Sequence, residues 1–216
     1  MIDFETLGVA PHGRVVDMAV VPFDIDKISS FNELAKSGLH LKFDLRSQSE
    51  RPIDPYTVEW WKGQSEEAKI NLKPNPDKDL TIEEAIKKYI DFLKSVGYDK
   101  SKSHVYCRGM SFDIPIFTNM LRGYLQRDNV TSEEPFKFWN ERDVRSCIEA
   151  YTMTRDMTSV PLRNGVLDGF IEHNSIHDCA KACLMLQYAK AYALGTEEPP
   201  SLEETDKNSV NKLRIT

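Results

Sequence analysis

Two acidic residues near the start of the chain, Asp3 and Glu5, have the type and spacing for metal chemistry. They lie in residues 2–6 (IDFET), and in a strand this alternation sends both carboxylates to one face. Two carboxylates on one face repel each other and lose hydration when covered, so a divalent cation is the expected partner. Taken by itself, the pentapeptide favours a frayed terminal tail with two solvated acids. The rest of the chain decides between these two interpretations.

Two further acids, Asp113 and Asp178, stand at the starts of expected helices. The partial positive charge of a helix N-terminus keeps a carboxylate ionised and tolerates its burial, although each acid alone is also typical of an ordinary helix start. His173 precedes Asp178 by five residues, which would put the two side chains about 140° apart on one helix. They converge only if His173 lies in the loop before the helix, with Asn174 or Ser175 as the cap.

Together these motifs resemble those of the DnaQ-like 3′–5′ exonucleases, whose fold is RNase H-like. Residues 3–6 (DFET) match the DxET motif, residues 111–113 (SFD) resemble the second motif, and residues 173–178 (HNSIHD) match the HxxxxD motif of the DEDDh branch. Their order and spacing fit over residues 1–194. Residues 57–61 (TVEWW), 108–113 and 167–178 also resemble the exonuclease A group of T-even bacteriophages and, more distantly, a bacterial exoribonuclease group with a TxxWW segment.

The resemblance implies a catalytic centre made of Asp3, Glu5, Asp113, Asp178 and His173. The four carboxylates would hold two Mg²⁺ or Mn²⁺ ions, which agrees with the preference of hard cations for oxygen ligands. The histidine would act as general base on the attacking water, since its ordinary pKa lies near neutrality. The implied reaction is hydrolysis of the terminal phosphodiester at a nucleic acid 3′ end, with release of nucleoside 5′-monophosphates.

The implied substrate is DNA, because the resemblance to the phage group is the nearer one, and RNA is the alternative. A second alternative is an inactive nucleic-acid-binding module that keeps the fold. Such a module should have lost one of the carboxylates or the histidine, and all of them are present. The sequence indicates no oligomeric state.

Four more positions are candidates for substrate binding. Leu7 and Thr6 belong to the DxET region, where the family often wedges an apolar side chain between terminal bases, and the alternative for Leu7 is packing on the core. Trp60 and Trp61 could stack on a base, and we expect one to be buried and one to lie near the cleft, with Trp61 taken as the contact. Arg108 either faces a phosphate or is simply exposed.

Composition restricts the kind of contact. The chain has 28 basic and 34 acidic residues, a net charge of −6, whereas proteins that grip a long stretch of duplex are normally basic. A small contact area with metal ions supplying positive charge is therefore expected. There is no run of about 18 apolar residues and no secretory signal pattern, so no membrane association is expected. The four cysteines lack paired or zinc-type spacing, which fits a reducing cytoplasm.

The elements that must position these residues follow from periodicity and capping signals. We expect strands over 1–5, 14–23 and 40–45 as an antiparallel meander, then strands over 104–107 and within 137–144. We expect helices from Asp54-Pro55 to Trp61, from Thr81 to Gly97, and over 112–125, 146–153 and 176–194. The pattern predicts an α/β domain over residues 1–195, with a mixed central sheet flanked by helices. Residues 196–216 are polar and aperiodic and are predicted to be a disordered tail.

Overall fold

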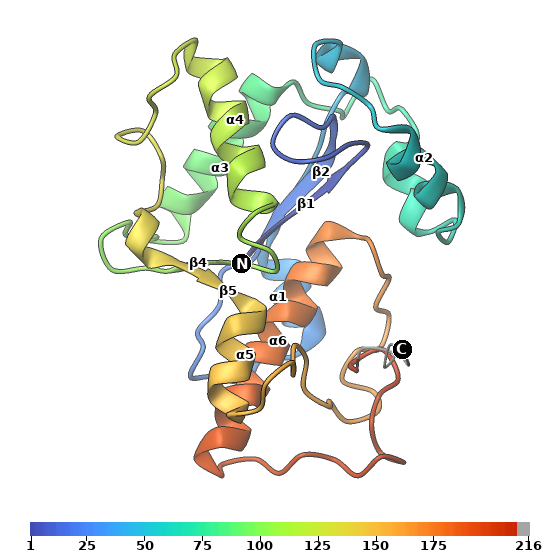
Figure 1. The fold of residues 1–216 in the computed structure, drawn as a ribbon, viewed down its shortest axis with the longest axis vertical. Helices are drawn as coiled ribbons and strands as arrows, with labels where there is room; N and C mark the ends of the chain where they lie inside the picture. The colour runs from blue at the N-terminus through green and yellow to red at the C-terminus, as the bar shows by residue number, and fades with distance from the viewer. Residues whose placement is uncertain (211–216) are drawn as a thin grey trace.

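Three antiparallel strands form the sheet that carries the first acidic motif (Figure 1). The computed structural model describes residues 1–210. The strands β1 (Ile2–Thr6), β2 (Val15–Val20) and β3 (Leu39–Lys42) pair in the order β1-β2-β3, which confirms the predicted meander. Buried residues alternate with partly exposed ones along β1, so Asp3 and Glu5 do share one face of the sheet.

A second, two-stranded sheet lies beside β1. Its strands β4 (Val105–Cys107) and β5 (Glu141–Asp143) run parallel, so the fold is α/β with both kinds of pairing. The expected single mixed sheet is instead two separate sheets, because β1 and β4 are not paired with each other. The N–H of Val21 donates to Met1 O, and strand alternation therefore turns the N–H of Phe4 away from β2. That N–H donates to Oδ1 of Asp113 rather than to β4.

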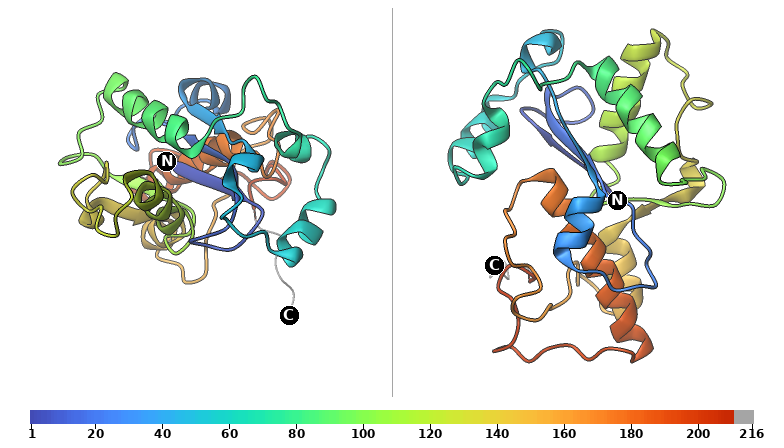
Figure 2. Two further views of the ribbon diagram at one scale, coloured as in Figure 1. Left: turned by 90° about the horizontal axis from the view of Figure 1, so that it is seen from above. Right: turned by 180° about the vertical axis from the view of Figure 1, so that it is seen from behind.

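Helices cover both faces of the three-stranded sheet (Figures 1 and 2). On one face, α3 (Ile82–Ser95) and α4 (Asp113–Leu125) enclose a core that includes Ile2, Phe4 and Met18. On the other face, α6 (Ser175–Leu194) packs across β1 and β2, and α1 (Phe31–Ser37) and α5 (Val144–Thr152) pack on α6. The carboxylates of β1 therefore meet the first turn of α6. No helix among residues 1–210 is long and apolar enough to cross a membrane.

Local signals account for most helix starts. Thr81 and Glu84 form the expected capping box of α3, and Asp54 caps α2 (Pro55–Lys62) by accepting the N–H of Thr57 at 2.8 Å. The helix α1 was not expected, although Ser30 and the glutamate three residues later form the same kind of box. Strands β2 and β3 are shorter than predicted, and 3₁₀ turns occupy Leu45–Gln48, Ala68–Leu72 and Phe138–Asn140.

Within the predicted tail, residues 201–210 contact the segment before α6. The N–H of Asp206 donates to Leu162 O at 2.8 Å, and the N–H of Leu162 donates to Oγ of the buried Ser209 at 3.1 Å. Arg163 and Thr205 form an isolated antiparallel bridge. The irregular segment before α6 has backbone groups without strand partners, and the polar C-terminal segment satisfies them. Positions 211–216 of the predicted tail lie outside the described residues.

Candidate active site

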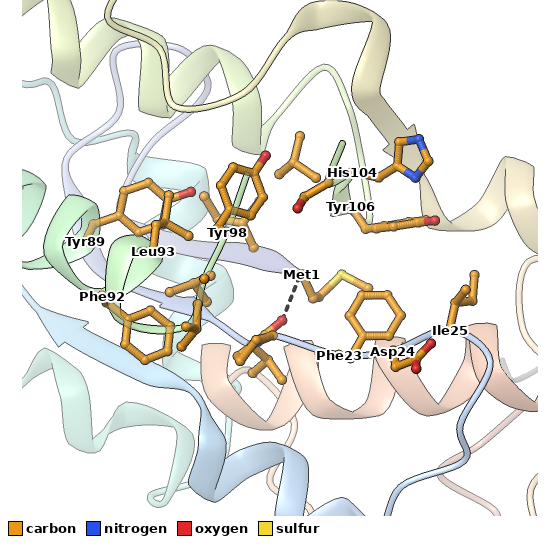
Figure 3. A pocket seen from close by; sticks show the side chains of 18 of the residues that line it. Met1, Phe23, Asp24, Ile25, Tyr89, Phe92, Leu93, Tyr98, His104 and Tyr106 are labelled. Atoms are coloured by element: carbon orange, nitrogen blue, oxygen red, sulfur yellow. Dashed lines mark hydrogen bonds between the residues drawn. The ribbon is translucent and has the colours of Figure 1, made fainter. Parts of the chain in front are cut away.

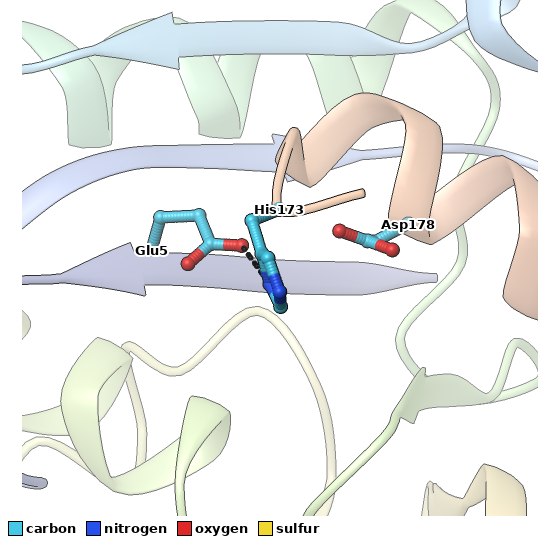
Figure 4. A group of neighbouring side chains, drawn as sticks. All are labelled: Glu5, His173 and Asp178. Carbon is cyan, nitrogen blue, oxygen red and sulfur yellow. Dashed lines mark ion pairs between the residues drawn. The ribbon is translucent and has the colours of Figure 1, made fainter. Parts of the chain in front are cut away.

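The β1 carboxylates line a cavity of about 260 Å³ together with residues of the α6 start. Asp3 and Glu5 come from β1, Asp178 comes from the first turn of α6, and His173 comes from the loop before it. Glu5, His173 and Asp178 each bring one potential ligand atom within 4.8 Å of the others. Figure 4 shows the imidazole of His173 lying between the two carboxylates, with Nδ1 3.9 Å from Oε1 of Glu5.

The loop position of His173 is the one that the five-residue spacing required. Asn174 is the N-cap of α6, and its side chain accepts the N–H of His177 at 3.4 Å. His173 itself has a φ of 61°, in the left-handed region, which turns the chain back toward β1 before the helix begins. Its ring packs edge to face against Trp60, with ring centroids 4.6 Å apart. The predicted convergence of His173 and Asp178 is therefore present.

Asp113 lies behind this cavity rather than on its wall. The side chain is buried at the start of α4, and its Oδ1 accepts the N–H of Phe4 at 3.1 Å. This bond ties α4 to the middle of β1, between Asp3 and Glu5. The charge of Asp113 acts on Asp3, where it is the largest influence on the carboxyl pKa after burial.

The four carboxyl groups are in an environment that opposes ionisation. Burial raises the pKa of Asp3 and of Glu5 well above the ordinary range, and neighbouring carboxylates raise both further. Burial likewise raises the pKa of Asp113 and of Asp178 to about 7. Carboxylates clustered in this way are stabilised when cations lie among them. Hard oxygen donors with one imidazole fit Mg²⁺ or Mn²⁺ better than a soft metal ion.

Two comparisons with known proteins agree with this geometry. The sequence profile of the 3′–5′ exoribonuclease Rv2179c-like domain matches residues 1–189. The chain is also 46% identical over 225 residues to a protein of Enterobacteria phage T4 named exodeoxyribonuclease, covering 99% of this chain and 98% of the relative.

The chain belongs to the Rv2179c-like family.

It is accordingly a 3′–5′ exonuclease, as the resemblance implied. The motifs that carried the resemblance all lie within the matched residues.

In this Rv2179c-like exonuclease, the side chains of Trp61 and Thr6 are buried. Trp61 is only 3% exposed and donates its Nε1–H to Thr6 O at 2.8 Å. Thr6 is also buried, and its hydroxyl donates to Gly8 O at 2.6 Å. Both residues brace the end of β1, and their contact with substrate stays a prediction. Trp60 is 44% exposed and, beside His173, is the tryptophan that lies near the cavity.

The other two predicted substrate residues have different surroundings. Leu7 is half-buried, and its backbone exchanges hydrogen bonds with Arg14 O and with the N–H of Asp54, each at 2.8 Å. Arg108 follows β4 and lines the carboxylate cavity. Burial lowers the pKa of its guanidinium, and the charge of Arg145 lowers it further, while Asp178 acts in the opposite direction.

Sequence reasoning missed three charged residues that line the cavity and one that is buried beside it. Arg145, Lys181 and Glu172 line the carboxylate cavity, from α5, α6 and the loop before α6. Asp17 pairs with Glu5 across β1 and β2 and is 1% exposed. Its Oδ2 accepts Nδ2–H of Asn71 at 2.7 Å, while its Oδ1 is buried without a partner among the described residues. An aspartate inside the apolar run VVDMAV was the signal that could have identified it.

A larger cavity of about 400 Å³ lies on the other side of Met1 but lacks this chemistry (Figure 3). Aromatic and aliphatic side chains dominate its wall, among them Phe23, Tyr89, Tyr98 and Tyr106. Among residues 1–210, Asp24 is the one acid on that wall. The smaller cavity, where Glu5, His173 and Asp178 converge, is therefore the candidate active site.

Proposed function

We propose that the chain is a metal-dependent exodeoxyribonuclease that removes nucleotides from the 3′ end of single-stranded DNA. The observation that carries this proposal is the convergence of Glu5, His173 and Asp178, from β1 and the α6 start, in one cavity with Asp3. The 46% identity to a protein named exodeoxyribonuclease supports DNA as the substrate. We place its action in the cytoplasm, that of the host if the chain is of phage origin.

The proposed fold type is RNase H-like. An antiparallel meander of three strands, followed by strands joined in parallel with helices between them, supports it. In such an arrangement the middle of β1 faces the start of the last helix. That is where Asp3, Glu5 and Asp178 are found.

Two Mg²⁺ or Mn²⁺ ions are the proposed cofactors, held by Asp3, Glu5, Asp113 and Asp178. These four residues are the carboxylate set. Their raised pKa values and their mutual proximity support the assignment. Bound cations would lower these pKa values and would offset the repulsion between the neighbouring carboxylates. When bound, such ions polarise the phosphoryl group and stabilise the attacking and leaving oxygens of an in-line displacement. Asp113 would reach them through its remaining oxygen, since Oδ1 already accepts the N–H of Phe4.

His173 is the proposed general base. Burial lowers the pKa of its imidazole, which favours the neutral form that accepts a proton. The ring would take a proton from water as the water oxygen bonds to the terminal phosphorus. The bond between that phosphorus and the 3′-oxygen of the preceding nucleotide breaks, and the 3′-oxygen takes up a proton. The products are a nucleoside 5′-monophosphate and a strand shortened by one nucleotide.

Trp60 is the proposed platform for the terminal base. It is the exposed tryptophan next to His173, and base stacking on an aromatic ring requires an exposed face. Leu7, half-buried at the end of β1, is the proposed wedge between the last two bases. The proposed stacking on Trp60 and the proposed wedge of Leu7 would each contact only the end of the strand. Such a small contact area is expected for a protein of net charge −6.

The test is a comparison of end-labelled single-stranded DNA and RNA of one sequence. With Mg²⁺, we expect stepwise shortening of DNA from the 3′ end, release of 5′-monophosphates, and no cutting of circular single-stranded DNA. Glu5→Gln should abolish the activity in the same preparation, which excludes a contaminating nuclease. Faster digestion of RNA would make RNA the substrate in place of DNA, in agreement with the exoribonuclease name of the family. Cutting of the circle would identify an endonuclease and overturn the proposal.

A further inference from the structure

Three basic side chains converge on the carboxylate cavity from separate parts of the chain. Arg108 follows β4, Arg145 lies in the first turn of α5, and Lys181 lies on α6 three residues after Asp178. We call these three residues the basic set. The guanidinium of Arg145 lies above the turn after Arg108, with Nη1 3.5 Å from the position that a Cβ on Gly109 would take.

The basic set has no ionic partner among residues 1–210. None of the three side chains makes a hydrogen bond or lies within 4.0 Å of a carboxylate oxygen, although carboxylates share the cavity. Lys181 instead holds its ammonium 4.6 Å from the ring centroid of Phe170. Arg108 and Lys181 are also half-buried, where an unpaired cation is costly. A cation in such a place has its donors free for an anion that enters the cavity.

Charge counting indicates what kind of anion fits. The four negative charges of the carboxylate set balance two divalent cations. Among the side chains of the cavity wall, the three positive charges of the basic set are opposed by Glu172, which leaves two positive side-chain charges. A phosphodiester carries one negative charge, and it gains a second as the water oxygen bonds to phosphorus and the proton leaves. The two surplus positive charges therefore match the two negative charges of the phosphoryl group during the reaction.

We propose that Arg108, Arg145 and Lys181 bind the non-bridging oxygens of the terminal phosphate and stabilise the charge that develops on it during hydrolysis. This proposal rests on the proposed function. Donors already in place where charge develops favour the transition state over the bound substrate. The same donors would hold the phosphate of the nucleoside 5′-monophosphate product, which is a dianion near neutral pH.

The test uses Arg108→Gln, Arg145→Gln and Lys181→Gln, with Arg122→Gln as the matched control. Arg122 is an exposed cation near the end of α4 and does not line the carboxylate cavity. With Mg²⁺ and a short single-stranded DNA, we expect each variant of the basic set to cleave about 10- to 10³-fold more slowly, and the control to match wild type. Arg145→Lys and Lys181→Arg should recover part of the rate. Because Arg145 is exposed, its variant should fold even if Arg108→Gln does not.

Binding measurements separate phosphate contact from a merely structural role. In Ca²⁺ without turnover, thymidine 5′-monophosphate should bind each variant of the basic set about ten- to a hundredfold more weakly. Wild type should prefer a DNA with a normal terminal linkage over one with an uncharged terminal methylphosphonate, and the variants should lose that preference. Mn²⁺ affinity should change little.

Two results would overturn the proposal. One is wild-type turnover and product binding in all three variants. The other is a loss of Mn²⁺ affinity with the linkage preference intact, which would make the basic set a counter-charge for the carboxylates. If wild type hydrolyses neither DNA nor RNA, the proposed function fails instead. In that case, comparing how wild type and the variants bind DNA with a normal or a methylphosphonate terminal linkage would still test whether the basic set binds phosphate.

Discussion

Replacing Asp113 with asparagine should make the metal-free protein more stable and inactive at once. The amide oxygen of the new side chain would still accept the N–H of Phe4, so the tie between α4 and β1 is kept. The substitution removes a negative charge beside Asp3. Burial opposes ionisation at this position. A capping or purely structural aspartate would behave in the opposite way.

The size and sign of the effect follow from the pKa of Asp113. Burial raises that pKa to about 7 in the folded protein, against about 3.9 in the unfolded chain. A carboxyl with a raised folded pKa contributes stability below about pH 4 that is lost as the pH rises through about 7. About three pKa units correspond to an upper bound of about 4 kcal/mol. Because neighbouring carboxylates share the effect, we expect a gain on the order of 1–4 kcal/mol at pH 8 and little gain at pH 4.5.

The assay is thermal unfolding of wild type and Asp113→Asn in EDTA at pH 4.5 and pH 8, repeated at pH 8 with Mg²⁺. A chain of this size should shift its Tm by about 2–4 °C per kcal/mol. Mg²⁺ should stabilise wild type more than the variant, and turnover of the variant should fall by at least about 10²-fold. Asp143→Asn is the matched control, because Asp143 also lies at the start of a helix, as the cap of α5, but lies outside the carboxylate set. A variant less stable than wild type at pH 8, or one with normal turnover, refutes the reasoning.

Four further outcomes are expected. Trp61→Phe should lower the free energy of unfolding by about 1–3 kcal/mol, because it removes the buried bond to Thr6 O, and an unchanged Tm would contradict this. Trp60→Ala should leave the Tm nearly unchanged and raise KM for single-stranded DNA, and an unchanged KM would exclude stacking at this ring. His173→Ala should lower turnover about 10²- to 10⁴-fold while Mn²⁺ binding, followed by calorimetry, persists. His177→Ala should be the faster enzyme of the two, and the reverse order would move the base to His177. Excess EDTA should abolish hydrolysis and Mg²⁺ restore it, so activity that survives chelation would exclude a metal mechanism.

The geometry of the site also explains why an acidic protein can act on a polyanion. In the proposed function, bound divalent cations and the basic set would concentrate positive charge in one cavity, whereas several ion pairs among residues 1–210 lie at exposed surface positions. Attraction is then local and confined to the strand end. This predicts strong discrimination between a free 3′ end and internal nucleotides.

The sequence by itself determined the features that depend on neighbouring residues. Alternation in β1 put Asp3 and Glu5 on one face, and the capping box at Thr81 fixed the start of α3. With the five-residue spacing, convergence with Asp178 required His173 to precede the last helix, and Asn174, one of the two expected caps, does cap that helix. In each case the backbone geometry of a short segment sets the outcome, so a local pattern is sufficient.

Only the tertiary structure decided which residues meet across long separations. Asp113 reaches Phe4 over 109 positions, and Trp61 reaches Thr6 over 55. Adjacent tryptophans have the same local signal, yet the packing of α2 against β1 buries one and leaves Trp60 exposed. The convergence of the basic set and the ordering of residues 201–210 on the segment before α6 likewise depend on the packing of distant segments. Such contacts arise from the complementarity of surfaces that form only when the helices close over the sheet, and no local period encodes them.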